Sequence, residues 1–119
     1  MTSVYRVQDK HGRGPFKPGF TNKWLEHDKG LAPFFTEFPL LNLNAESTPD
    51  EFVGCACLEL EQLKRWFTQS EFKTLEAKGF KAVKMDVDRV LCSSKNQCVF
   101  ARKRQLRKGV VEVSLYDLA

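Results

Sequence analysis

The sequence has no apolar run that approaches the roughly 20 residues needed to cross a bilayer, and its first residues contain no apolar signal-peptide core. Internal repeats and low-complexity segments are also absent. These absences exclude membrane-spanning helices and repeat architectures, and they predict a soluble protein of the cytosol. What is present is 119 residues, 42% hydrophobic and 29% charged, which is typical of a single globular domain over residues 1–119.

The motifs of nucleotide-triphosphate and metal sites are missing as well. The glycines of Gly12-Arg13-Gly14-Pro15 match neither the phosphate loop nor the dinucleotide fingerprint that follows a strand and opens a helix. His11 and His27 are the only histidines, and no Glu or His stands at a spacing that would place metal ligands on one helix face. We therefore expect no metal site built on histidine.

Cysteine is present four times, at Cys55, Cys57, Cys92 and Cys98, enough for two disulfides or one zinc site. Structural zinc sites favour paired ligands two to four residues apart, whereas one residue separates the first pair and five separate the second. In a chain without an export signal, reduced cysteines that pack as small hydrophobic side chains are the better interpretation. We expect all four to be reduced and free of metal.

The charge is uneven along the chain. The net charge is +4, but residues 1–60 carry 6 Lys or Arg against 8 Asp or Glu, and residues 61–119 carry 13 against 7. The basic excess is concentrated in one short cluster, which consists of Arg102, Lys103, Arg104, Arg107 and Lys108. Such a cluster can contact the phosphates of a nucleic acid, but a solvated edge strand and turn explains it more simply.

Residues 12–41 combine turn-forming Gly and Pro with many apolar side chains, namely Phe16, Phe20, Trp24, Leu25, Phe34, Phe35, Phe38, Leu40 and Leu41. Long regular elements are incompatible with that Gly and Pro spacing, but so many apolar groups are incompatible with a solvated linker. We expect an ordered, packed loop region with a short helix near Thr21–His27. Long ordered loops often cover a site, and a structural cap over a sheet edge is equally compatible with the pattern.

The remaining elements are clearer, and they predict an α+β fold with two consecutive helices. Apolar side chains on one face indicate a helix over Leu58–Phe67, and Thr68-Gln69-Ser70-Glu71 has the form of a capping box that starts a second helix, which ends at Gly79. Strands are predicted at Val4–Val7, Phe52–Ala56, Phe80–Val90, Gln97–Ala101 and Val110–Tyr116. We expect one mixed or antiparallel sheet that brings the first, second and fourth of these strands together.

The order of these elements resembles the ADP-ribosyltransferase fold. Proteins of that fold place a short strand with Arg or His early, then a strand with small polar residues that leads into a helix, then a late strand with a catalytic Glu. Val4–Val7 is similar to the first element, Gly54–Glu59 looks like the second with cysteines where serines are expected, and Asn96–Phe100 is similar to the late strand.

This resemblance implies an NAD-binding cleft. Arg6 would hold a phosphate, Cys55, Ala56 and Cys57 would line the nicotinamide end, and Gln97 would stand at the ribose where the family has its Glu. A neutral amide can hydrogen-bond a ribose hydroxyl but cannot stabilise the positive charge of the transition state, a contribution worth orders of magnitude in rate. The resemblance therefore leaves open whether the protein is an enzyme.

A second resemblance covers the whole chain. Tyr5–Asp9 with Gly12–Phe16, Leu60–Phe67 and Gln97–Phe100 look like a group of small phage and prophage proteins. That resemblance implies a protein of the host bacterial cytosol with a host component as its partner. Two functions stay open: a nucleotide-binding transferase-like protein that modifies a host component, and a non-catalytic protein that inhibits a host factor such as a defence system through the loop region 12–41 and the basic cluster.

The two key polar residues give a geometric expectation. If the cleft exists, Arg6 and Gln97 should converge on it from neighbouring strands. Because neither is apolar, we expect Arg6→Ala and Gln97→Ala to leave the melting temperature near that of the wild type. Arg6→Ala should reduce nucleotide affinity more, since a charged hydrogen bond is stronger than a neutral one.

Overall fold

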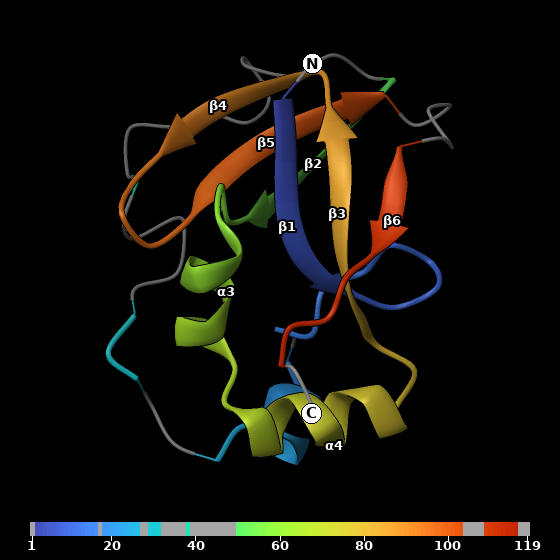
Figure 1. The fold of residues 1–119 in the computed structure, drawn as a ribbon, viewed down its shortest axis with the longest axis vertical. Helices are drawn as coiled ribbons and strands as arrows, with labels where there is room; N and C mark the ends of the chain where they lie inside the picture. The colour runs from blue at the N-terminus through green and yellow to red at the C-terminus, as the bar shows by residue number, and fades with distance from the viewer. Residues whose placement is uncertain are drawn as a thin grey trace.

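The computed structural model describes residues 2–16, 18–26, 29–31, 38, 50–103 and 109–116. Its strands form two three-stranded antiparallel sheets, one in the order β1-β3-β6 and the other in the order β2-β5-β4. Two helices lie consecutively between β2 and β3, so the fold class is α+β, as predicted. In Figure 1 β1 and β3 run side by side, with α3 beside them and α4 across their lower ends.

The first sheet is centred on β3 (Lys81–Val87). It pairs with β1 (Thr2–Gln8) from Thr2↔Val87 to Gln8↔Lys81, and with β6 (Val110–Glu112) on its other side. The predicted alternation along β3 is confirmed, because Val83, Met85 and Val87 are buried while Lys84 is exposed. The last strand is shorter than the predicted Val110–Tyr116 because β6 ends at Glu112, although the amide of Val113 still donates to the carbonyl of Ala82 in β3 at 2.9 Å.

The second sheet is built from β2 (Glu51–Ala56), β5 (Cys98–Lys103) and β4 (Arg89–Ser93), with β5 in the middle. The single strand predicted over Phe80–Val90 is wrong, since it divides into β3 and β4, which belong to different sheets. Asp88 marks the division. Its amide donates to the carbonyl of Ala101 at 3.1 Å, and its carboxylate accepts from the amide of Lys103 at 2.6 Å, so the chain crosses to β5 at this point.

The expectation of one continuous sheet also needs correction. Within the described residues, β1 meets the second sheet through one isolated bridge between Tyr5 and Cys57, with backbone hydrogen bonds of 2.7 and 2.8 Å. The next acceptor along β2, the carbonyl of Cys55, accepts from the guanidinium of Arg6 at 2.5 Å. We attribute the divergence of β1 and β2 to this side chain, which takes the carbonyl that continued pairing would use.

Each of the two helices begins at a capping box. In α4 (Gln69–Ala77) the Thr68 hydroxyl accepts from the amide of Glu71, and the Glu71 carboxylate accepts from the amide of Thr68, which confirms the predicted capping box. Gly79 follows with φ of +92°, a conformation that glycine adopts at little cost. In α3 (Leu60–Trp66) the side chain of Gln62 accepts from the amides before the helix, so it begins two residues later than predicted.

The loop region 12–41 is only partly within the described residues. A short 3-10 helix covers Thr21–Lys23, which is shorter than the helix expected near Thr21–His27; His27 itself lies outside the described residues. The next residue, Trp24, is 2% exposed and donates its indole N–H to the carbonyl of Pro15 at 3.1 Å. Trp24 packs in the same core cluster as Leu63, Leu75 and other side chains from α3, α4 and β1, so this part of the loop is packed, as expected.

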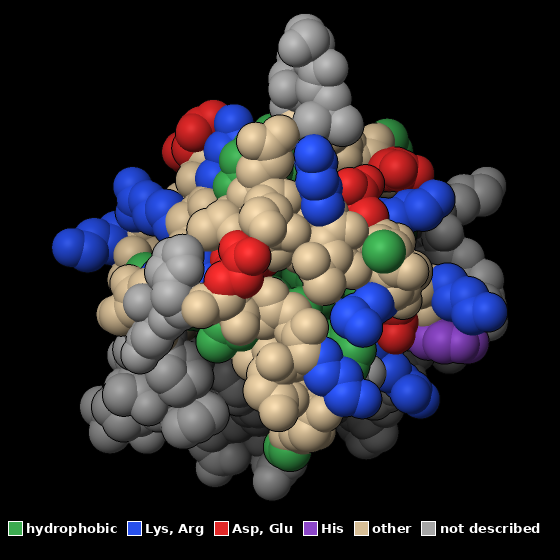
Figure 2. All heavy atoms as spheres, turned by 90° about the horizontal axis from the view of Figure 1, so that it is seen from below, with side chains coloured by type: hydrophobic (Ala, Val, Ile, Leu, Met, Phe, Trp, Pro, Cys, Tyr) green, Lys and Arg blue, Asp and Glu red, His purple; other side chains and the backbone are tan. Residues whose placement is uncertain are grey.

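The described side chains on the face at the α4 end form no large apolar area. Figure 2 shows the face at the α4 end, where charged side chains of both signs are spread and hydrophobic side chains form only small separate areas. Of the basic cluster, Arg102 and Lys103 lie at the end of β5, and the other three residues fall outside the described ranges.

Among the residues that the structure describes, no helix is long and apolar enough to span a membrane.

Candidate functional site

A cavity of about 540 Å³ lies where β1 and β2 diverge. Its walls come from β1, β2, α3, the residue before β5, and parts of the loop region 12–41. All five residues predicted from the sequence as site residues line it, namely Arg6, Cys55, Ala56, Cys57 and Gln97. The volume is within the range of small-molecule and cofactor sites, which is about 300–1,000 Å³.

Arg6 lines this cavity and is held there by three hydrogen bonds. Its guanidinium donates to the carbonyls of Cys55 at 2.5 Å and Gly12 at 3.2 Å, and to the side chain of Gln8 at 3.2 Å. The guanidinium carbon also lies 5.6 Å and 5.7 Å from the ring centres of Phe52 and Phe100, the geometry of a cation–π contact. Burial lowers the pKa of Arg6, while Cys55 and Asp9 act in the opposite direction, and an arginine remains charged in proteins.

These contacts change the stability that we expect for Arg6→Ala, which the sequence alone predicted to be near that of the wild type. Arg6 is only 8% exposed, and two of its acceptors are backbone carbonyls on two separate segments. Its removal would leave the carbonyl of Cys55 without its donor, which costs free energy of folding. Gln97 is 4% exposed, so its side chain is buried too, and truncation there is a change inside the fold rather than on its surface.

Two glycines make room for the guanidinium. A Cβ atom on Gly54 would lie 3.1 Å from Nη1 of Arg6 and 3.0 Å from the ring of Phe52. A Cβ atom on Gly14 would lie 3.3 Å from Nη2 of Arg6. All three distances are shorter than ordinary van der Waals contacts, so the absence of a side chain at these positions lets β2 and the loop close around Arg6.

Cys55 and Cys57 bring thiols to the cavity wall, and all four cysteines are free. Burial raises the pKa of Cys55 to about 11, against the opposite effect of Arg6, and raises the pKa of Cys57 to about 12. Thiols with such pKa values are almost entirely protonated at neutral pH, so they are poor nucleophiles. Among the described residues, no group of three or more His, Cys, Asp or Glu side chains could hold a metal ion.

Gln97 stands immediately before β5, at the end of a tight turn. The amide of Ser94 donates to the carbonyl of Gln97 at 2.8 Å, and the amide of Gln97 donates to the hydroxyl of Ser94 at 3.3 Å. These bonds close the turn between β4 and β5. Arg6 lies on β1 of the first sheet and Gln97 directly precedes β5 of the second, and both line the same cavity. They therefore meet at one cavity as expected, but not from neighbouring strands.

The cavity has aromatic walls and a positive charge. Phe16, Phe52, Trp66 and Phe67 line it, and the rings of Phe16 and Trp66 meet edge to face at 5.7 Å. Among the described lining residues the charged side chains are Arg6 and Lys29, and none is Asp or Glu. An anionic ligand that carries a planar ring fits this combination better than a cation or a neutral sugar would.

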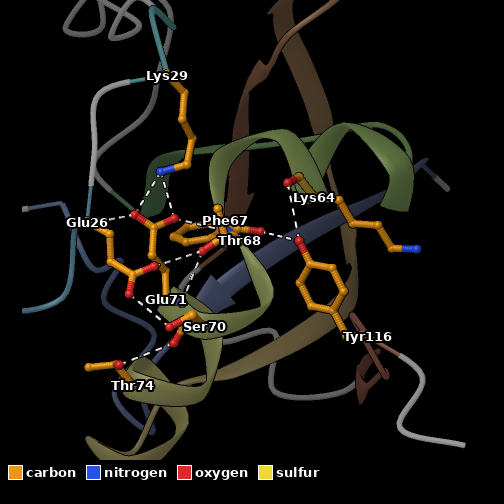
Figure 3. A network of polar contacts seen from close by, with 9 residues as sticks. All are labelled: Glu26, Lys29, Lys64, Phe67, Thr68, Ser70, Glu71, Thr74 and Tyr116. Atoms are coloured by element: carbon orange, nitrogen blue, oxygen red, sulfur yellow. Dashed lines mark hydrogen bonds and ion pairs between the residues drawn. The ribbon is translucent and has the colours of Figure 1, made fainter.

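A contact that could not be predicted from the sequence holds Lys29, which lines one side of the cavity. Lys29 Nζ lies 2.6 Å from one carboxylate oxygen of Glu71 and 2.8 Å from the other, and the amide of Glu26 donates to the same carboxylate at 2.8 Å (Figure 3). Glu71 has no exposed surface. Burial favours a raised pKa, but the hydrogen bonds from Lys29 and the amides of Thr68 and Glu26 outweigh it and lower the pKa to about 2.

A second cavity of about 430 Å³ lies between α4 and the chain that follows β6. Its walls include Lys73, Glu76 and Glu112 beside apolar side chains such as Phe72 and Tyr116. None of the predicted site residues lines it. The cavity at Arg6 is therefore the better candidate.

Comparison with known proteins places the chain among phage proteins. A model of a family described as the bacteriophage T4 Y00F protein matches residues 1–114. No curated protein matches, and no solved structure matches. The resemblance to small phage proteins is thereby confirmed, whereas the resemblance to the ADP-ribosyltransferase fold stays a prediction.

Proposed function

Since the chain belongs to the bacteriophage T4 Y00F protein family, we propose that it acts in the cytosol of the infected host, where the cavity at Arg6 binds an NAD-type nucleotide. The observation that carries this proposal is the arrangement of three elements around one cavity. Arg6 comes from the first strand, Cys55–Cys57 from the strand that leads into a helix, and Gln97 from the start of a late strand. That is the order in which proteins of the ADP-ribosyltransferase fold supply their NAD site.

The charge of the cavity supports an anionic ligand. A guanidinium has five N–H groups, and the three hydrogen bonds of Arg6 leave two of them without a protein acceptor among the described residues. A pyrophosphate oxygen can accept from these groups without displacing the carbonyl of Cys55. The rings of Phe16 and Trp66 offer surfaces against which a nicotinamide or adenine ring can pack.

The residues of this cavity suit the binding of NAD better than the transfer of ADP-ribose from it. The transferase reaction needs a carboxylate near the ribose, and Gln97 supplies a neutral amide in its place. No described lining residue is Asp or Glu, and the thiols of Cys55 and Cys57 are held protonated. We therefore expect affinity for NAD with little or no turnover.

Isothermal titration with NAD and with ADP-ribose tests this proposal. The wild type should release or take up heat with both ligands at millimolar concentration or below. Arg6→Lys keeps the charge but loses the forked geometry, and it should weaken binding by about tenfold or more. Arg102→Lys is the matched control, because Arg102 also donates to a backbone carbonyl, that of Asp86 at 2.8 Å, but does not line the cavity.

Gln97→Glu asks whether the missing carboxylate limits the chemistry. With an acid at this position, slow release of nicotinamide from NAD should become measurable above the wild-type level. Intact-mass analysis of host proteins after incubation with this variant would reveal an added ADP-ribosyl group. An unchanged rate in a variant that still binds NAD would argue against a transferase-like arrangement.

The second candidate function is inhibition of a host factor without catalysis. The absence of Asp and Glu among the described lining residues favours it, since a cavity without a carboxylate has no evident catalyst for transfer. Under this function the partner is a host protein, and the loop region 12–41 and the basic cluster form the contact. Two results would favour this function over nucleotide binding: no heat with NAD or ADP-ribose at millimolar concentration, and inhibition of the host factor by Arg6→Lys that equals inhibition by the wild type.

A further inference from the structure

The turn before Gln97 is held by side chains of α3. The indole N–H of Trp66 donates to the carbonyl of Asn96 at 2.9 Å, and the amide of the Gln62 side chain donates to the carbonyl of Lys95 at 2.8 Å. Arg65 donates to the same Lys95 carbonyl at 3.4 Å. Three side chains of one short helix therefore bind two consecutive carbonyls of the β4–β5 turn.

Trp66 is the member of this group that also reaches the cavity. Its ring lines the wall and meets Phe16 edge to face, while its N–H holds the residue directly before Gln97. The thiol of Cys57 donates weakly to the same Asn96 carbonyl at 3.6 Å, so the turn is tied to β2 as well. Because the peptide unit is planar, holding the Asn96 carbonyl from two sides also holds the plane that carries the amide of Gln97.

We propose that Trp66 is a positioning residue, which sets the direction of the Gln97 side chain by holding the carbonyl of Asn96. The role rests on the proposed nucleotide site, since Gln97 acts there on the ligand. Trp66 itself contributes through the turn, and its ring contact with a ligand is secondary. A positioning role differs from simple core packing in one respect. The effect of a Trp66 substitution on NAD affinity must disappear when Gln97 is replaced.

Trp66→Phe tests the role, because it removes the N–H donor and keeps an aromatic ring. The dissociation constant for NAD should rise about 3- to 10-fold, the effect of one lost hydrogen bond. In a Gln97→Ala background the same change should alter the constant by less than about 2-fold. Equal losses in both backgrounds would mean that Trp66 acts on the ligand directly, and the proposal would be wrong.

Tyr116→Phe is the matched control. The Tyr116 hydroxyl donates to the carbonyls of Phe67 and Lys64 at the C-terminal end of α3, the end that also carries Trp66, and Tyr116 lies outside the cavity at Arg6. Its loss loosens the helix without touching the turn. NAD affinity should stay within about 2-fold of the wild type, and an effect as large as that of Trp66→Phe would show that general loosening of α3 is the cause.

Amide hydrogen exchange gives a readout that does not depend on the ligand. In Trp66→Phe the amides of Asn96 and Gln97, which donate to the Ser94 hydroxyl, should exchange faster, whereas those of β5 beyond Val99 should not. Unchanged exchange in the turn would overturn the proposal. If wild-type protein binds no NAD, the proposed function fails, and the exchange result still decides whether Trp66 holds the turn.

Discussion

The ion pair between Lys29 and Glu71 makes stability depend on pH in a direction that can be worked out. The pKa of Glu71 is about 2 in the folded protein, against an ordinary value of 4.5. As the pH falls below about 4.5, the Glu71 carboxylate becomes protonated in the unfolded chain but stays ionised in the folded protein. Stability from this group is therefore present above pH 4.5 and is lost as the pH falls toward 2.

The magnitude follows from the difference between the two pKa values. This difference in pKa corresponds to about 3 kcal/mol of free energy of unfolding at neutral pH. The value is an upper limit for Glu71 alone, because the neighbouring charges contribute to the same interaction. Glu71→Gln removes the charge and leaves Lys29, which is 14% exposed, without its carboxylate. We expect a loss of about 3 kcal/mol at pH 7, and less if the flexible Lys29 side chain turns to solvent.

Urea unfolding, followed by tryptophan fluorescence at several pH values from 7 to 2.5, measures both effects. The wild type should lose much of its stability between pH 4.5 and 2.5, and Glu71→Gln should change much less over that interval. Glu76→Gln, an exposed change on the same helix, should stay within about 0.5 kcal/mol of the wild type. Parallel pH curves for the wild type and Glu71→Gln would refute the reasoning.

Three further predictions concern the cavity. Arg6→Lys should lower the free energy of unfolding by about 1.5–3 kcal/mol in urea titrations, because an ammonium cannot reach both the Cys55 and Gly12 carbonyls; an unchanged midpoint would contradict the contacts assigned to the guanidinium. Gly54→Ala should cost about 1–3 kcal/mol in the same assay, because the new methyl group would lie 3.0–3.1 Å from Phe52, Arg6 and Phe100, and a stability equal to the wild type would mean that the strand shifts freely. Cys55 should react with iodoacetamide at pH 8 at least about tenfold more slowly in the folded protein than in urea, since its pKa is about 11; equal rates would show that the thiol is neither buried nor held protonated.

Local signals in the sequence predicted most of the elements. The capping box at Thr68 and Glu71 is a short-range pattern in which the side chain of each residue accepts a hydrogen bond from the backbone N–H of the other. It can therefore be recognised without knowledge of the tertiary structure. The alternation along β3 similarly reports a strand with one buried face. The class of fold could be predicted from these elements, whereas the approach of Arg6 and Gln97 to one cavity was expected from the resemblance of their order to the ADP-ribosyltransferase fold.

What could not be predicted depends on contacts between distant residues. We attribute the divergence of β1 and β2 to the bond between the Arg6 side chain and the Cys55 carbonyl, and no local sequence pattern predicts that a side chain takes the place of a strand pairing. The change of sheet at Asp88 depends on its bonds to β5. The pair of Lys29 and Glu71 joins residues 42 positions apart, and neither its burial nor its place beside the cavity is visible from composition or spacing.

Titration of NAD into wild-type protein, Arg6→Lys and Arg102→Lys tests the central claim most directly. A nucleotide site at Arg6 predicts saturable heat with the wild type and with Arg102→Lys, and binding about tenfold or more weaker with Arg6→Lys once circular dichroism shows that this variant is folded. Equal affinity in all three proteins, or no heat with the wild type at millimolar NAD, would contradict it.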